Sequence, residues 1–168
     1  NRELVESHLS AVWLAETGHK LDASIKNLLD MNEETKPLLP DLADAMDRAE
    51  VTRRAHTRAE RIMGMVATEL PPEKAPWYTQ DWVEDTVRTA FRRFDAAFSR
   101  WRELIQATNR QMNLNHAIQT NHAATPKERR EAKQRYDEAS RQQALLLADS
   151  NTQSSDFYTY RYLAGQGF

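Results

Sequence analysis

A long stretch from about Gln80 to His122 limits what this chain can fold into. Apolar residues recur there every three or four positions, which keeps one stripe on one side of an α-helix, and no glycine or proline interrupts the run. The stripe consists of Val83, Val87, Phe91, Phe94, Phe98, Trp101 and Ile105, followed by Thr108 and Met112. At 1.5 Å per residue, a single helix over this stretch would be about 60 Å long. One compact core cannot cover such a rod, so its distal half needs a partner helix.

The residues that follow supply this partner. Thr125, Pro126 and Glu128 match a capping box, with a hydroxyl at the N-cap, proline at the first helical position and glutamate at the third. They predict a returning helix from Pro126 to about Asp149. Its expected inward residues are Ala132, Tyr136, Ala139, Gln143, Leu146 and Leu147. The two helices together predict a long, protruding antiparallel coiled-coil hairpin over residues of about 80–149.

The first half of the chain predicts a helical base for this hairpin. Only four glycines and frequent Ala, Leu, Arg and Glu favour helix over sheet. We expect helices from Arg2 to about Thr17, from Asp22 or Ser24 through Leu29, from Pro37 or Pro40 through Met46, and from Glu50 to Glu69, with Pro71–Pro72 ending the last. The connector to Tyr78 contains Trp77 beside Pro76 and should pack down. The fold class is therefore all-α, with residues 1–149 forming one helical domain.

Charge and composition narrow the functional classes. The 168 residues carry a formal net charge of −2, which gives no global electrostatic attraction to nucleic acid but leaves room for a local basic face. The chain has no cysteine, which excludes disulfides and thiolate metal sites and is compatible with the cytoplasm. No apolar run is long enough to span a membrane and no signal-peptide pattern is present. We expect a cytoplasmic protein without a membrane partner.

No catalytic motif can be found in this sequence. The four glycines, at positions 18, 64, 165 and 167, do not form a phosphate-binding loop, so we expect no ATPase activity and no cofactor in this segment. Glu16 and His19 have the Glu-x-x-His spacing of di-iron bundles, but Gly18 breaks the helix between them and no second copy exists. His116 and His122 are six residues apart and do not share a helix face. We expect no metal site.

Arginines gather in two places and are the candidates for phosphate contacts. One group consists of Arg53, Arg54, Arg58 and Arg61, and the other of Arg88, Arg92, Arg93, Arg100 and Arg102. Phosphate recognition needs such a face. The alternative is a solvated surface with internal ion pairs, because Glu60, Asp85, Asp95 and Glu103 are interspersed.

The end of the chain has its own composition. A Ser/Asn/Gln-rich linker over residues 150–155 leads into an aromatic tail that contains Phe157, Tyr158, Tyr160, Arg161, Tyr162 and Phe168. Rings and a cation together occur on surfaces that bind single strands. The favoured interpretation is instead a strand or extended segment that packs on its own domain or on a missing one. The chain starts at Asn1 without Met and ends on an aromatic residue, from which we expect a piece of a longer protein.

Several of these stretches resemble one family. The residues that carry the resemblance are Asn1–Glu16, Ala75-Pro-Trp-Tyr78, Arg93-Phe-Asp95, Arg100-Trp-Arg-Glu-Leu104 and Ser155–Ala164 followed by Gly167-Phe168. They resemble the region that follows the second motor domain in large bacterial DEAD/DEAH-box (superfamily 2) helicases, of the kind found in DISARM-type anti-phage defence systems. The sequence departs from the family in the extra glycine of Gly165-Gln166-Gly167. The family's ATPase residues lie in motor domains, and none of them matches a residue here.

The resemblance implies a function. The chain would be a non-catalytic accessory domain of an ATP-dependent DNA helicase or translocase, with residues 150–168 leading into a missing domain. It would scaffold the motor and contact DNA or a partner subunit, with Arg88, Arg92, Arg93 and Arg100 as the phosphate-binding candidates. The alternative is a protein-interaction module without a nucleic-acid role, which would depend on apolar residues near the hairpin tip such as Leu114 and Ile118.

Overall fold

The computed structural model describes residues 1–148 and 158–168, and 70% of it is helical. The elements are α1 (Arg2–Glu16), the 3₁₀ turn η1 (Ile25–Asn27), α2 (Pro40–Met46), α3 (Ala49–Val66), α4 (Gln80–Arg88), α5 (Ala90–Ala97), α6 (Ser99–Thr120), α7 (Pro126–Leu147) and α8 (Tyr158–Gly165). Within the described residues there is no strand, only an isolated antiparallel bridge between Leu29 and Leu38. The expected all-α fold class is confirmed.

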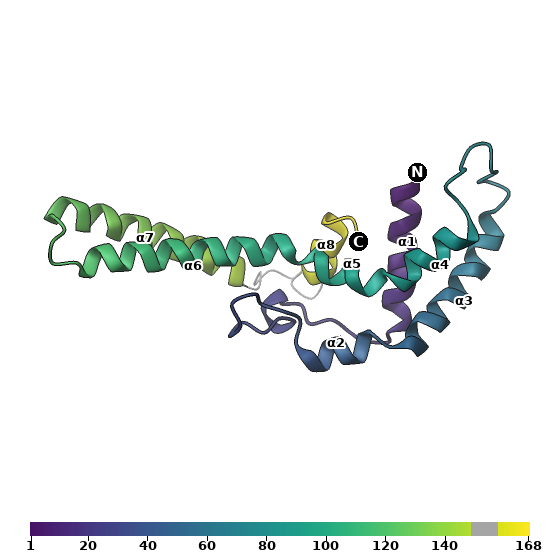
Figure 1. Ribbon diagram of the computed structural model, residues 1–168, viewed down its shortest axis with the longest axis horizontal. Coiled ribbons are helices and arrows are strands. Elements are labelled where there is room, and N and C mark those ends of the chain that lie inside the picture. The colour runs from purple at the N-terminus through teal and green to yellow at the C-terminus, as the bar shows by residue number, and fades with distance from the viewer. Residues whose placement is uncertain (149–157) are drawn as a thin grey trace.

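The molecule is elongated, with a base at one end and a hairpin at the other (Figure 1). The hairpin consists of α6 and α7, which pack along each other in opposite directions. The base consists of α1–α5, η1 and α8. None of the described helices combines the length and the apolar character needed to cross a membrane.

The long stretch beginning at Gln80 forms three consecutive helices, α4, α5 and α6, so the expectation of one uninterrupted helix is wrong. Thr89 and Phe98 separate them. The hydroxyl of Thr89 donates to the carbonyl of Asp85 at 2.8 Å, a side-chain contact that tends to bend helices. The amide of Phe98 donates to the carbonyl of Asp95, three residues back, which tightens the turn there. The predicted stripe nevertheless faces the core over most of its length, since Val83, Val87, Phe94, Phe98, Trp101 and Ile105 are buried.

The base helices begin and end largely where local chemistry predicts. Gly18 adopts a positive φ of 63° directly after α1, as expected for a helix stop. Pro40 opens α2 at its first position. However, α3 ends at Val66, before Glu69.

The helix expected from Asp22 or Ser24 to Leu29 does not form, and only η1 is helical there. The carboxylate of Asp22 accepts a hydrogen bond from the amide of Ser24 at 2.8 Å, which stabilises a turn instead. Leu29 then pairs with Leu38 across a loop. Lys36 in this loop has a positive φ of 48°, is only 6% exposed, and places its ammonium group 3.3 Å from the carbonyls of Met31 and Glu33. These contacts close the loop around the lysine side chain.

The aromatic tail packs on its own domain, but as the helix α8 and not as the expected strand or extended segment. Leu163 is 2% exposed in the core, and the hydroxyl of Thr159 donates to the carbonyl of Asp22 at 2.6 Å. The hydroxyl of Tyr160 accepts from the amide of Leu21 at 3.0 Å. The linker expected at 150–155 lies outside the described residues.

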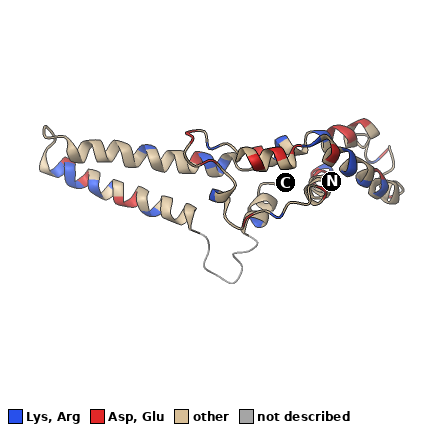
Figure 2. Ribbon diagram, turned by 90° about the horizontal axis from the view of Figure 1, so that it is seen from below, with Lys and Arg blue, Asp and Glu red and all other residues tan. Residues whose placement is uncertain are grey.

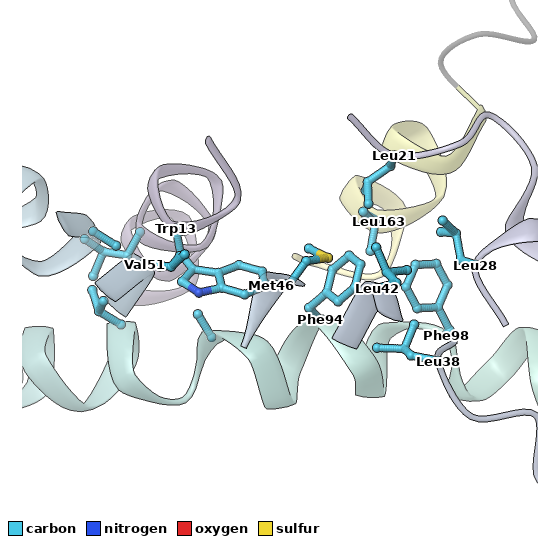
Figure 3. Packing of buried hydrophobic residues seen from close by; sticks show 14 of the residues in the cluster. Trp13, Leu21, Leu28, Leu38, Leu42, Met46, Val51, Phe94, Phe98 and Leu163 are labelled. Atoms are coloured by element: carbon cyan, nitrogen blue, oxygen red, sulfur yellow. The ribbon is translucent and has the colours of Figure 1, made fainter. Parts of the chain in front are cut away.

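Aromatic rings from both ends of the chain meet in the core of the base. The ring of Phe168 lies 6.1 Å from Trp13 and 5.7 Å from Phe94, both edge to face. Figure 3 shows Met46 of α2 and Leu163 of α8 beside the rings of this core. The core is therefore assembled from the first helix, the middle of the chain and its last residues.

The predicted capping box at the start of α7 is confirmed. The amide of Glu128 donates to the hydroxyl of Thr125, and the Glu128 carboxylate accepts from the Thr125 amide at 2.7 Å. Beyond the turn, Ala132 and Ala139 are buried against α6. The hairpin is thus present, while coiled-coil packing of its side chains stays a prediction.

Candidate nucleic-acid interface

The four arginines predicted to bind phosphate do not form one surface. Arg93 lies where α1, α4 and α5 meet, and its guanidinium group is largely engaged there. It donates to the carbonyl of Thr86 at 2.8 Å, to the hydroxyl of Thr89 at 2.8 Å and to the hydroxyl of Ser10 at 3.1 Å. Its Nε lies 3.3 Å from the carboxylate of Glu6. Arg93 therefore joins helices of the base.

Arg93 is partly buried. Its side chain is 26% exposed, and desolvation lowers the pKa of the guanidinium group, an effect that the carboxylates of Glu6 and Asp85 oppose. This environment could not be predicted from the sequence, because the partners Glu6 and Ser10 are more than 80 residues away along the chain.

The other three candidates are exposed. Arg88 forms an ion pair with Asp85, one helical turn before it. Arg92 and Arg100 are exposed, and among the described residues neither has a side-chain hydrogen bond or an ion pair. Arg92 lies on the last helix of the base and Arg100 at the start of α6, and both remain open to an external anion.

The second arginine group lies on α3, at the end of the molecule opposite the hairpin tip (Figure 2). Arg53, Arg54, Arg58 and Arg61 line an open groove of about 690 Å³ together with Thr57 and two carboxylates, Glu16 of α1 and Glu50 of α3. We call this the α3 groove. The sequence identified these arginines as a basic cluster but could not place Glu16 beside them, since it comes from another helix.

The hairpin has polar groups inside its helix–helix contact. Asn115 is 1% exposed and donates to the carbonyl of Gln111 at 2.7 Å. Two helical turns closer to the base, the side-chain amide of Gln143 in α7 donates to the hydroxyl of Thr108 in α6 at 3.1 Å. Buried polar residues at such positions fix the register of paired helices. The bond between Gln143 and Thr108 joins the two helices and favours this register of the hairpin.

The hairpin also exposes apolar side chains. Leu114 is 58% exposed and Leu145 is 77% exposed. Leu145 contributes to a shallow groove near the hairpin root that is also lined by Leu104, Ala107 and Leu146. Such a surface could contact another protein.

A metal centre is not evident in the described part of the chain, where no three His, Asp or Glu side chains are grouped to hold an ion. His116 lies beside the ring of Tyr136, with ring centroids 6.4 Å apart, on the outside of the hairpin.

Comparisons with known proteins identify no relative. The chain has no significant match among protein-family models, curated proteins or solved structures.

Proposed function

We propose that this chain is a non-catalytic helical accessory domain of an ATP-dependent DNA helicase or translocase. The domain would support the ATPase motor domains of the helicase, and its exposed arginines would contact DNA phosphates. The helicase context comes from the sequence resemblance. The single observation that supports DNA contact is the exposure of Arg92 and Arg100 without an acidic partner in the described residues.

The arrangement of the exposed arginines fits this function. Arg92 lies on α5 and Arg100 at the start of α6, on the segment that joins the base to the projecting hairpin (Figure 1). A duplex or strand held there would lie beside the hairpin, which could act as a guide for it. Arg88 is a weaker candidate, because Asp85 neutralises part of its charge.

The test is binding of the 168-residue chain to labelled single- and double-stranded DNA across a salt series. We expect affinity that falls steeply with salt, because each phosphate contact releases a counterion. Arg92→Gln/Arg100→Gln should reduce the slope of log K against log salt by about 1.4 to 1.8. The absence of binding at low salt would contradict the DNA-contact function.

The second candidate is a protein-interaction module. It is favoured by the exposure of Leu114 and Leu145 on the hairpin, since a partner that covered these side chains would bury apolar surface. In that case Leu114→Ser should abolish capture of the partner subunit while DNA affinity is unchanged. Partner binding should also be insensitive to salt.

A further inference from the structure

The α3 groove has a local charge opposite to that of the chain. Four guanidinium groups and the two carboxylates of Glu16 and Glu50 leave a formal charge of +2 in the groove, whereas the whole chain carries −2. The segment that carries Arg92 and Arg100 also has more arginines than carboxylates, so charge alone does not distinguish the groove from it. The α3 groove differs from that segment because its four arginines line one concave surface.

Glu16 shows how an anion is held in this groove. Its two carboxylate oxygens lie 3.5 Å from Nε of Arg54 and 3.0 Å from a terminal nitrogen of Arg58. Arg54 also donates to the backbone carbonyl of Glu16 at 3.0 Å and to the carboxylate of Glu50 at 2.6 Å. The carboxylate of Glu16 occupies one anion position, so the central arginines are already in use.

The two outer arginines of the groove have no such partners. Arg53 and Arg61 are exposed, and their side chains make no hydrogen bond or ion pair within the described residues. They are eight positions apart on α3, which at 1.5 Å per residue separates them by about 12 Å along the helix axis. A linear chain of charges can contact both arginines, whereas a compact anion would require both side chains to bend toward it.

We propose that the α3 groove is a second phosphate-contact surface, which holds the backbone of a nucleic-acid strand between Arg53 and Arg61. Arg58 contributes its remaining donors at the centre, and Glu16 limits the affinity by occupying part of the site. This inference rests on the proposed function, because it assumes a nucleic-acid partner. It adds a contact surface separate from Arg92 and Arg100.

Arginine suits this role chemically. Its planar fork of donors matches the geometry of a phosphodiester oxygen pair, and it stays charged at every physiological pH. A strand carries regularly spaced charges, so contacts at the two ends of the groove can form at the same time. Such contacts depend on backbone charge and not on base sequence.

The first experiment compares two double variants of the 168-residue chain, Arg53→Gln/Arg61→Gln and Arg92→Gln/Arg100→Gln. The probe is a labelled single-stranded oligonucleotide of mixed sequence, titrated across a salt series. We expect Arg53→Gln/Arg61→Gln to lower the salt slope by about 1.4, because two phosphate contacts are lost at about 0.7 each for single strands. None of these four arginines forms an ion pair in the described residues, so the melting temperature should be unchanged in both variants.

The second experiment removes the carboxylate that Arg54 and Arg58 bind in the α3 groove. Glu16→Gln removes the carboxylate that engages Arg54 and Arg58, so it should raise oligonucleotide affinity several-fold and steepen the salt slope. Glu138→Gln on α7 is the matched control, since it changes the net charge equally but lies outside the groove. A circular-dichroism melt of each variant checks that α1 and α3 remain packed.

The outcomes separate the two proposals. If the wild-type chain binds and only Arg92→Gln/Arg100→Gln weakens it, the α3 groove is contradicted while the proposed function stands. If the wild-type chain does not bind the oligonucleotide at low salt, the proposed function and the groove both fail. Binding of labelled poly-glutamate that is as tight as that of the oligonucleotide would contradict a strand-specific groove and indicate an acidic protein partner.

Discussion

Asn115 and Arg135 meet across the hairpin, where Nε of Arg135 in α7 donates to the side-chain oxygen of Asn115 in α6 at 2.9 Å. Asn115 is 1% exposed, whereas Arg135 is exposed. The pair therefore connects the inside of the hairpin to its surface. It defines which residues of the two helices stand opposite each other.

This pair should couple energetically. Asn115→Ala removes the acceptor and should lower the free energy of unfolding by about 1 kcal/mol. A double-mutant cycle with Arg135→Ala, measured by urea unfolding, should give a coupling energy of about 0.5–1 kcal/mol. Asn113→Ala, at an exposed position on the same helix, is the control and should change stability little. Strict additivity of the two substitutions would mean that the contact contributes nothing.

Arg93 and its neighbour Arg92 should behave oppositely. Arg93→Gln removes contacts to α1 and α4 and should lower the free energy of unfolding by about 2 kcal/mol, because Glu6 loses its cation and the carbonyl of Thr86 loses its donor. Arg92→Gln, on the exposed side, should change stability by less than about 0.5 kcal/mol. Chemical denaturation of both variants tests this. Equal stability of the two variants would contradict the internal position of Arg93.

The hydroxyl of Tyr160 should matter for the attachment of α8. The amide of Leu21 donates to it at 3.0 Å, and Leu21 is 2% exposed, so Tyr160→Phe leaves a buried donor without an acceptor. We expect the free energy of unfolding to fall by about 1–2 kcal/mol. The control is Tyr136→Phe on the hairpin, whose hydroxyl makes no hydrogen bond in the described residues. A melting temperature equal to that of the wild type would show that α8 is held by its apolar contacts alone.

Alkaline pH should destabilise the helical base of the molecule. Burial raises the pKa of the Tyr162 hydroxyl and of the Tyr78 hydroxyl above their ordinary value. A raised pKa in the folded state gives stability that is fully present below the unfolded-state pKa of about 10 and is lost as pH rises through the folded-state pKa. The free energy of unfolding should therefore decline above about pH 10, and Tyr162→Phe should reduce this decline. Identical pH profiles for the wild type and Tyr162→Phe would contradict the assignment.

The sequence predicted the elements whose signals are local. The capping box at Thr125, the glycine stop at Gly18 and the proline start at Pro40 each act within one turn of backbone, and the structure places each where it was expected. The buried stripe from Val83 to Ile105 also follows from spacing alone, because it repeats the helical period.

The features that the sequence could not predict depend on distant contacts. The alternating aromatics of the tail suggested a strand, but Thr159 and Leu163, four residues apart, are its most buried residues and belong to one face of a helix. That face is defined by the surface on which it packs, including Leu21 and Asp22. Arg93 looked like its exposed neighbour Arg92 for the same reason, since only the position of α1 distinguishes them.

The contact between the two ends of the chain has a consequence for folding order. The hydroxyl of Ser7 donates to the carbonyl of Gly167 at 2.9 Å, so α1 can make this contact only after residue 167 has been synthesised. The helices of the hairpin, by contrast, are joined by a short turn, and contacts of low sequence separation form quickly. During translation the hairpin can therefore form before α1 contacts α8. Until residues 158–168 are present, Trp13 lacks the ring of Phe168, whereas its partners Phe91 and Phe94 are already available.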